Sequence, residues 1–156
     1  MEPPARAPAL LPRPFTPADQ AAARQLILDG LGEHFGFVDA SRNPDLADIA
    51  ATYLARGHVF LVAERAGALV GTGALLVAEE TRAGQIVRMS VAGAQRRHGI
   101  GRALVAALIA AAQARGLRRL TVETNKDWYD AIGLYIASGF REDTLDEESI
   151  YLQRTL

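Results

Sequence analysis

The chain has 156 residues, 49% of them hydrophobic, and a formal net charge of −1, so it can bury a core as one compact domain but lacks the basic excess that nucleic-acid binding requires. It has no cysteine, which excludes disulfides, thiolate metal sites and a cysteine nucleophile. No apolar run approaches the about 20 residues of a membrane-spanning helix, so we expect a cytoplasmic protein without membrane contact, with residues 1–9 as a disordered lead-in and residues 10–156 as a single domain.

The N-terminal part predicts a short strand and a helix. The strand covers residues 9–11 and is closed by prolines that follow it. Thr16-Pro17-Ala18-Asp19 then gives the helix an N-cap, a proline at its first position and a carboxylate three residues on. Gly30 or Gly32 is expected to loosen the end of this helix.

The next part predicts a second helix and a hairpin. Asn43-Pro44-Asp45 starts the helix by the same cap-and-proline logic, and Gly57 ends it. Residues 58–66 and 68–78 are predicted as two strands, because they flank Gly67 as a tight turn.

The best-defined functional pattern lies between Gln85 and Leu104, where a strand, a glycine-rich loop and a helix follow one another. This order aims several unpaired backbone N–H groups at one point, where the helix dipole adds about half a positive charge. Glycines allow close approach to the backbone, and cationic side chains suit phosphate oxygens. The residues predicted to hold a pyrophosphate are Arg96, Arg97, His98, Gly99, Ile100, Gly101 and Arg102.

The C-terminal part predicts a strand at 117–124, a helix at 128–138 and two strands at 140–144 and 149–155. Gly139 is the expected C-cap of the helix. The sequence shows no internal repeat and no domain linker. The order β, α, α, β, β, β, α, β, α, β, β therefore predicts an α/β (α+β) sandwich of sheet and packed helices.

Two common phosphate motifs match the loop poorly. A P-loop needs lysine and then serine or threonine where Arg102 and Ala103 stand, and the dinucleotide fingerprint needs a third glycine where Leu104 stands. The pattern Arg96-x-x-Gly99-x-Gly101 instead resembles the coenzyme A loop of the GNAT acetyltransferase superfamily, although Gly93 replaces a proline that many members carry. The run Ala131-x-x-Leu134-Tyr135-x-x-x-Gly139-Phe140 resembles the second signature of the same superfamily.

The resemblance covers nearly the whole chain and implies the GNAT fold, with a mixed, largely antiparallel central sheet flanked by helices. It implies direct transfer of acetyl from acetyl-coenzyme A to a primary amine, in a small molecule or a peptide, without a metal. In relatives the central strand and the next one splay apart, and pantetheine pairs with the exposed strand. That role falls here on Met89, Ser90 and Val91, and a backbone N–H of this strand would meet the oxyanion.

Two side chains carry the chemistry in this interpretation. In relatives the tyrosine of the second signature lies beside the coenzyme sulfur, so Tyr135 is expected to contact the cofactor and to protonate the thiolate, which suits a phenol of pKa about 10. Gln85 stands where many relatives carry a glutamate and cannot usefully accept a proton. Glu123, at the end of the following strand, resembles the glutamate that serves as base in protein N-terminal acetyltransferases.

Alternatives stay open. Tyr135 is alternatively a packing aromatic and Glu123 an exposed strand-end carboxylate, while His34 and His58 are bases by chemistry alone. The alternative function is a non-catalytic acyl-coenzyme A sensor, which needs the loop but neither side chain. A homodimer is compatible with the sequence. The acidic residues that weakly favour a cationic acceptor are Glu33, Asp39, Asp45 and Asp48.

Overall fold

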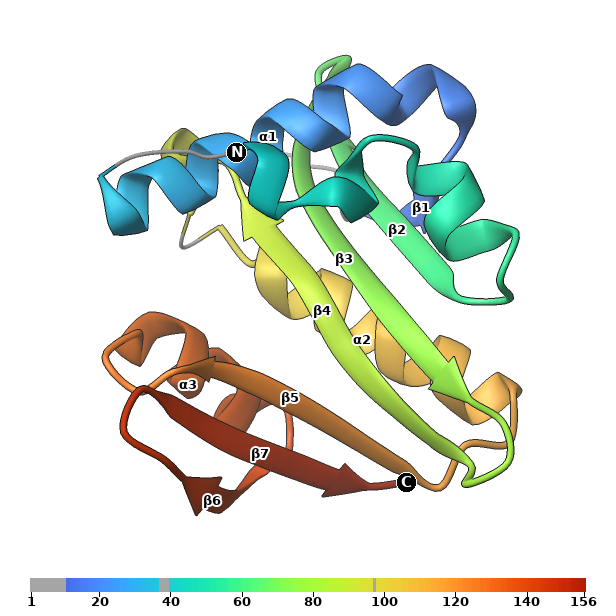
Figure 1. Ribbon diagram of the computed structural model, residues 1–156, viewed down its shortest axis with the longest axis vertical. Coiled ribbons are helices and arrows are strands. Elements are labelled where there is room, and N and C mark those ends of the chain that lie inside the picture. Colours follow the sequence, from blue (N-terminus) through green and yellow to red (C-terminus); the bar gives the residue numbers. More distant parts are fainter. Residues whose placement is uncertain (1–10, 37–39, 97) are drawn as a thin grey trace, which may run out of the picture.

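The computed structural model describes residues 11–36, 40–96 and 98–156. Within these ranges the chain forms a seven-stranded sheet in the order β1-β2-β3-β4-β5-β7-β6 (Figure 1). Neighbouring strands are antiparallel except β4 and β5, which are parallel, so the predicted mixed, largely antiparallel sheet is confirmed. The strands are β1 (Arg13–Pro14), β2 (Val59–Arg65), β3 (Ala68–Ala78), β4 (Ala83–Val91), β5 (Arg119–Asn125), β6 (Arg141–Leu145) and β7 (Ser149–Thr155).

The first strand differs from its prediction at residues 9–11. Residues 9 and 10, with the expected lead-in 1–9, lie outside the described residues, and the observed strand β1 comprises Arg13 and Pro14. The other six strands lie within two residues of their predicted bounds.

Helices cover both faces of the sheet (Figure 1): α1 (Gln20–Phe35) packs on one face, and α2 (Ile100–Ala114) and α3 (Tyr129–Ala137) pack on the other. Alternation along β2 shows this division, because Phe60 and Val62 are buried with α1 while Leu61 and Ala63 are buried with α2. A strand that is covered on both faces is apolar without interruption, which explains the continuous hydrophobic run of β2.

The helix predicted to follow residue 43 is instead two short helical segments. A 3-10 turn covers Pro44–Leu46 and a π-helical turn covers Ala50–Leu54. The Gln20 side chain of α1 enters between them, where its Nε2 donates to the Leu46 carbonyl at 2.8 Å and its Oε1 accepts from the Ile49 N–H at 3.0 Å. These bonds satisfy groups that would otherwise pair within one helix, so the segment is interrupted.

The first helix continues through Gly30 and Gly32, which are expected from the sequence to loosen its end. It ends at Phe35, and the following Gly36 has a φ of 75°, the left-handed conformation typical of a helix C-cap. Gly30 serves packing, since a Cβ there would lie 3.0 Å from the Ser90 Oγ of β4. A side chain at this position would therefore require Ser90 or the helix to shift by a few tenths of an ångström.

A bidentate ion pair anchors the start of α1. The Arg13 Nη1 and Nη2 donate to Asp19 Oδ2 and Oδ1 at 2.8 and 2.9 Å, and the Thr16 N–H donates to the same carboxylate at 2.9 Å. The hydrogen bond from Arg13 is the main reason that the pKa of Asp19 is lowered from 3.8 to about 2, against the opposing effect of burial.

We expect Asp19→Asn to destabilise the fold by at most about 2 kcal/mol at neutral pH and by a small fraction of that in strong acid. A lowered folded-state pKa contributes stability that is present above the unfolded value of 3.8 and is lost as the pH falls toward about 2. Urea unfolding of both proteins at about pH 7 and about pH 2 measures the difference. A loss of stability that is equal at the two pH values would show that the ion pair is not its cause.

Candidate active site

Strands β4 and β5 separate where the predicted cofactor motif leaves the sheet. They pair only from Ala83↔Arg119 to Ile86↔Val122. Beyond this point β4 stays with β3 and β5 stays with β7, so the two strands diverge (Figure 1). Within the described chain, residues 87–91 therefore have no neighbouring strand on the β5 side. An extended ligand can pair with such a flank as an added strand.

A bulge in β4 lies beside this opening. The register of β4 against β3 shifts, so that Arg88 and Met89 together oppose Gly73. Arg88 has a φ of 55°, which is uncommon for a residue with a side chain. Its carbonyl accepts a hydrogen bond from the buried Thr72 Oγ1 of β3 at 2.8 Å. Because the C=O and the N–H of a trans peptide point in opposite directions, the Met89 N–H is turned away from β3, toward the opening.

The hydrogen bonds between β4 and β3 beyond the bulge orient the backbones of the other two predicted pantetheine contacts, Ser90 and Val91. The Ala92 N–H donates to the Val70 carbonyl at 2.9 Å, and alternation then faces the backbone of Ser90 toward β3 and that of Val91 toward the opening. The Ser90 hydroxyl contacts a carbonyl of α1 at 3.4 Å. Thus Met89 and Val91 present backbone groups to the opening, whereas Ser90 faces β3 and α1.

The loop after β4 is tied to α1 through Arg96. Its Nη2 lies 2.5 Å from Glu33 Oε2, and its Nε donates to the Val91 carbonyl at 3.3 Å. Arg96 is therefore already paired with a carboxylate. An arriving phosphate would compete with Glu33 for the Nη2 donor or bind to the other N–H groups of this guanidinium.

The start of α2 is open to a ligand at Gly99. This glycine has a φ of 81°, and nothing lies within 4 Å of the position of a Cβ there. The Ile100 side chain is buried in the core, and a Cβ on Gly101 would meet Leu134 of α3 at 3.1 Å. Both residues therefore turn their Cβ side inward, and what remains at the helix start is unpaired backbone N–H. His98 is exposed, and Arg97 lies outside the described residues.

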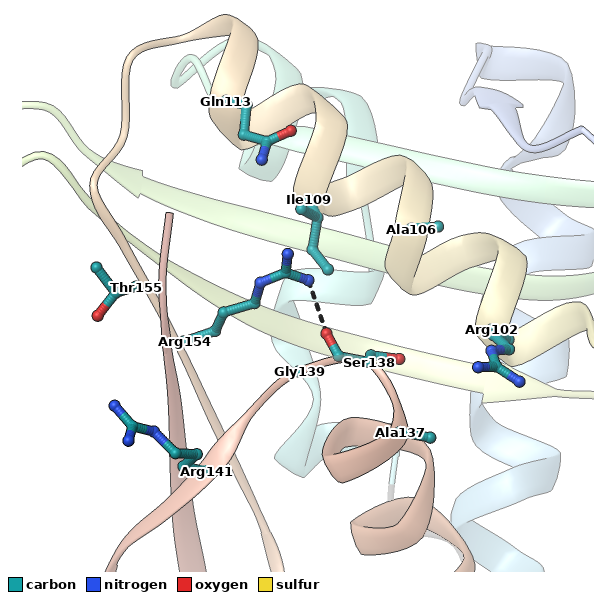
Figure 2. Close-up of a pocket in the computed structure, with 10 residues that line it drawn as sticks. All are labelled: Arg102, Ala106, Ile109, Gln113, Ala137, Ser138, Gly139, Arg141, Arg154 and Thr155. Carbon is teal, nitrogen blue, oxygen red and sulfur yellow. Dashed lines mark hydrogen bonds between the residues drawn. The ribbon is translucent and has the colours of Figure 1, made fainter.

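A positively charged groove continues from the start of α2, between this helix, the end of α3 and strands β6 and β7 (Figure 2). Its volume is about 660 Å³, and Arg102, Arg141 and Arg154 line it. The Arg154 Nη1 donates to the Ser138 carbonyl at 2.7 Å. Among the described residues none of these arginines pairs with a carboxylate, so the groove extends the positive field of the loop.

Tyr135 lies on α3, on the α2 face of the sheet. Its side chain is 4% exposed, and its ring packs edge to face on Phe140 with centroids 5.8 Å apart. Burial raises the pKa of the phenol above its ordinary value of 10, so the hydroxyl is protonated throughout the neutral range. In this neutral form the phenol can donate a proton but cannot accept one as a base, and its raised pKa makes it a weaker acid than a free phenol.

Glu123 lies on the opposite face. Its neighbours Leu120 and Val122 on β5 are buried in the same cluster as Tyr135, so alternation directs Glu123 toward the α1 face. Glu123 is exposed, and the Tyr151 hydroxyl of β7 lies 3.3 Å from its Oε1 and 3.0 Å from Asp146 Oδ2, so the two carboxylates share its single proton. The two candidate catalytic side chains thus flank β5 from opposite sides.

Sequence reasoning missed Tyr151 and Arg88. Tyr151 faces Glu123 only because of the β5–β7 register, which no local pattern predicts. Arg88 reaches Asp45 in the segment before β2, with two hydrogen bonds of 2.9 and 2.6 Å. The alternative base His58 has a structural contact, because its Nδ1 accepts from the Val77 N–H at 2.9 Å.

The acidic residues that favoured a cationic acceptor are mostly occupied. Asp45 is paired with Arg88 and Glu33 with Arg96. The Asp48 Oδ1 accepts from the N–H of Ala51 at 3.1 Å, as a helix cap does. Asp39 lies outside the described residues. These three carboxylates therefore give no support for a preference for cationic amines.

The described residues contain neither a candidate metal site nor a candidate membrane-spanning helix. In the ranges 11–36, 40–96 and 98–156, no cluster of three potential metal ligands was found. The helices in the same ranges are too short or too polar to cross a membrane.

Comparison with known proteins identifies the family. The model of the Acetyltransferase (GNAT) family matches residues 21–140. N-acetyltransferase family 8 member 2 of Rattus norvegicus is 37% identical over 102 residues, which cover 63% of this chain and 45% of the relative. The chain spans about half the length of the curated relatives that it matches.

Solved structures agree with the sequence comparison. Ribosomal-protein-alanine N-acetyltransferase from Brucella melitensis is 25% identical with a TM-score of 0.77, covering 94% of this chain and 100% of the other. PaiA N-acetyltransferase from Thermoplasma acidophilum, in complex with coenzyme A, shares the fold with a TM-score of 0.80 at 12% identity, covering 95% and 99% of the two chains. Because the family model spans well over half of the sequence, the chain belongs to the GNAT acetyltransferase family.

Proposed function

We propose that the protein is an N-acetyltransferase that moves the acetyl group of acetyl-coenzyme A directly to a primary amine. The observation that carries this proposal is the divergence of β4 and β5, which opens beside the glycine loop and the start of α2. Coenzyme A is an extended chain that ends in a pyrophosphate-linked nucleotide. An open strand flank followed by a helix N-terminus matches that order of groups.

In this proposal the backbones of Met89 and Val91 pair with the extended pantetheine, and the start of α2 receives the pyrophosphate. The backbone N–H groups around Ile100 supply the helix-terminus donors. The side chains proposed to assist the phosphates are Arg96, Arg97, His98 and Arg102.

The opposite positions of the two candidate side chains fit an attack through the opening. The amine enters from the α1 face as an ammonium, gives one proton to Glu123 and bonds as the free amine to the thioester carbon. The nitrogen then gives a second proton to water, the carbon–sulfur bond breaks, and the thiolate takes the proton of Tyr135 on the α3 face, which Tyr135 regains from water. The Met89 N–H donates to the carbonyl oxygen while it carries negative charge.

The proposed acceptor is a primary amine of a peptide or a small molecule. A neighbour from Brucella melitensis is named for an alanine of a ribosomal protein, and it is similar to this chain over nearly its whole length. A short peptide with an N-terminal alanine is therefore the first acceptor to test, beside polyamines and free amino acids.

Thiol release from acetyl-coenzyme A in the presence of these amines tests the proposal. The chain has no cysteine, so every thiol detected comes from the coenzyme. We expect release above the rate of hydrolysis with at least one amine. Binding of coenzyme A without turnover on any amine would favour the acyl-coenzyme A sensor instead. A thermal shift with coenzyme A that equals the buffer control would contradict both functions.

We expect Gly99→Asp to bind coenzyme A about 10-fold more weakly than Gly99→Asn, because only the first adds a negative charge near the pyrophosphate. Both substitutions place a side chain in open space, at a φ of 81° that Asp and Asn tolerate similarly. The pair therefore separates charge from backbone strain. Calorimetry of the two variants measures the difference, and equal affinities would mean that the phosphates bind elsewhere.

A further inference from the structure

Arg88, the left-handed residue of the β4 bulge, is held at both of its ends. Its carbonyl accepts from Thr72 Oγ1 at 2.8 Å. Its guanidinium donates through Nε and Nη2 to the two oxygens of Asp45, at 2.9 and 2.6 Å, and through Nη2 to Asn43 Oδ1 at 3.1 Å. The side chains of Arg88 and Asp45 are only 20% and 24% exposed, so the pair is largely shielded from water.

Tyr53 also holds Asp45. The Tyr53 hydroxyl donates to Asp45 Oδ2 at 2.6 Å, and the buried Tyr53 ring packs on Phe60 of β2 with centroids 5.2 Å apart. Burial alone would raise the pKa of Asp45, but the hydrogen bonds from Arg88 and Tyr53 outweigh it and leave this pKa below its ordinary value. Asp45 is therefore a charged carboxylate at neutral pH. We call Asp45, Tyr53 and Arg88 the bulge clamp.

The bulge clamp holds the backbone of Arg88 in a left-handed conformation, which residues with a side chain disfavour. A left-handed conformation costs a residue with a side chain about 1–2 kcal/mol, so Arg88 needs contacts that hold it there. A bidentate pair with a carboxylate is among the strongest and most directional contacts available to an arginine. With the guanidinium and the carbonyl both fixed, the peptide between Arg88 and Met89 has one orientation.

We propose that Asp45 is a positioning residue for acetyl transfer, which acts through Arg88 to aim the Met89 N–H at the thioester oxygen. The proposal rests on the function proposed above. Asp45 itself belongs to the segment before β2 that packs with α1, on the face from which the amine enters. The bulge clamp thus joins the acceptor side of the protein to the backbone donor.

This position makes the contribution of Asp45 specific to the transition state. The carbonyl oxygen gains charge only while the amine attacks, so a correctly aimed N–H stabilises the transition state more than the bound substrate. Misplacement of such a group by about 1 Å can cost about 100-fold in rate. Loss of the bulge clamp should therefore lower kcat and leave the affinity for acetyl-coenzyme A nearly unchanged.

The test compares Asp45→Asn with Asp19→Asn. Asp19 forms a bidentate pair of similar geometry with Arg13, at the start of α1 and on the far side of β3 from the opening. We expect both variants to lose thermal stability. Only Asp45→Asn should lower kcat, by about 10- to 100-fold, with the Kd of acetyl-coenzyme A changed less than about 2-fold. Equal kcat in the two variants, assayed well below their melting temperatures, would overturn the proposal.

An infrared measurement tests the same point without any acceptor. Acetyl-coenzyme A labelled with ¹³C at the acetyl carbonyl shows a stretching band that moves to lower frequency when the oxygen accepts a hydrogen bond. In the wild-type complex we expect this lowered band, and in Asp45→Asn a return toward the frequency of the free thioester, with Asp19→Asn like the wild type. If the wild type did not bind the thioester, the proposed function would be refuted. If all three proteins bound it with the same band, only the positioning role of Asp45 would be refuted.

Two further variants carry the test if Asp45→Asn does not fold. Tyr53→Phe removes one hydrogen bond to Asp45 and keeps the ring, and Arg88→Lys keeps the charge but loses the planar fork. We expect an intermediate band position in both. An unchanged band in both folded variants would overturn the proposal.

Discussion

Tyr135→Phe should lower kcat by about 10²–10⁴-fold, which is the usual contribution of a positioned general acid, and leave the affinity for coenzyme A nearly unchanged. The substitution removes one hydroxyl and keeps the ring that packs edge to face on Phe140. Since the proton reaches the sulfur only as the carbon–sulfur bond breaks, the lost interaction belongs to the transition state. The fold and the bound coenzyme should therefore be preserved.

Tyr129→Phe is the matched control, because this tyrosine belongs to the same helix and is 76% exposed. Steady-state thiol release on a confirmed acceptor, together with calorimetry, separates kcat from binding. Burial raises the pKa of Tyr135 above 10, so the wild-type enzyme should show no loss of activity from ionisation of this phenol below that pH. If Tyr135→Phe and Tyr129→Phe had the same kcat, the Tyr135 hydroxyl would have no role in catalysis and the side chain would serve packing alone.

Glu123→Gln should lower kcat/KM by about 10²–10⁴-fold in the acid part of the pH profile and by progressively less as the pH rises. An α-amino acceptor has a pKa of about 7.7–8.0, so below that range the amine is protonated and needs a base. Above that range the acceptor is already a free amine, so it can attack without first giving a proton to a base. The variant should therefore recover part of the lost rate across this range.

The control is Glu142→Gln, an exposed glutamate on the outer strand β6. Profiles of kcat/KM against pH are compared for the wild type and the two variants. If Glu123→Gln runs parallel to the wild type at every pH, this carboxylate is not the base, and the alternative of an exposed strand-end charge holds.

Much of the fold was predictable because its signals are local. The strand, loop and helix from Gln85 to Leu104 were recognised from apolar spacing and glycine, and β4 and α2 lie there. The first helix is predicted from its cap, but Gly30, which is expected to loosen the helix end, instead serves the crossing of α1 over β4. A glycine in a helix has the same letter whether it stops the helix or makes room for a neighbour.

The second predicted helix failed for a non-local reason. The side chain of Gln20 supplies the hydrogen bonds that a continuous helix would make near Ile49. No local sequence pattern in this segment indicates that a side chain of α1 will bond to it. Local caps predicted where this segment begins, and a tertiary contact decided its form.

The candidate site was predictable in its parts and not in its connections. The sequence suggested Tyr135 and Glu123, and the sheet places them on opposite faces of β5. It also suggested Arg96 for phosphate, without the carboxylate of Glu33 that holds this arginine now. The sequence suggests Asp45 as part of a helix start and as a charge for the acceptor, whereas in the structure Arg88 pairs with it. Pairs far apart in the chain depend on the register of the sheet, which a single sequence does not contain.

The two outermost strands of the sheet have a consequence for how the protein behaves at high concentration. β1 has two residues, and one of them is Pro14, which lacks an N–H. β6 is exposed along its whole length and carries Arg141, Glu142 and Asp143 in succession. Short, proline-bearing and charged edges resist pairing with a second molecule and so protect against edge-to-edge aggregation. Within the described residues, the inner flank of β4 at residues 87–91 is then an unpaired strand flank that lies inside the sheet and not at its edge.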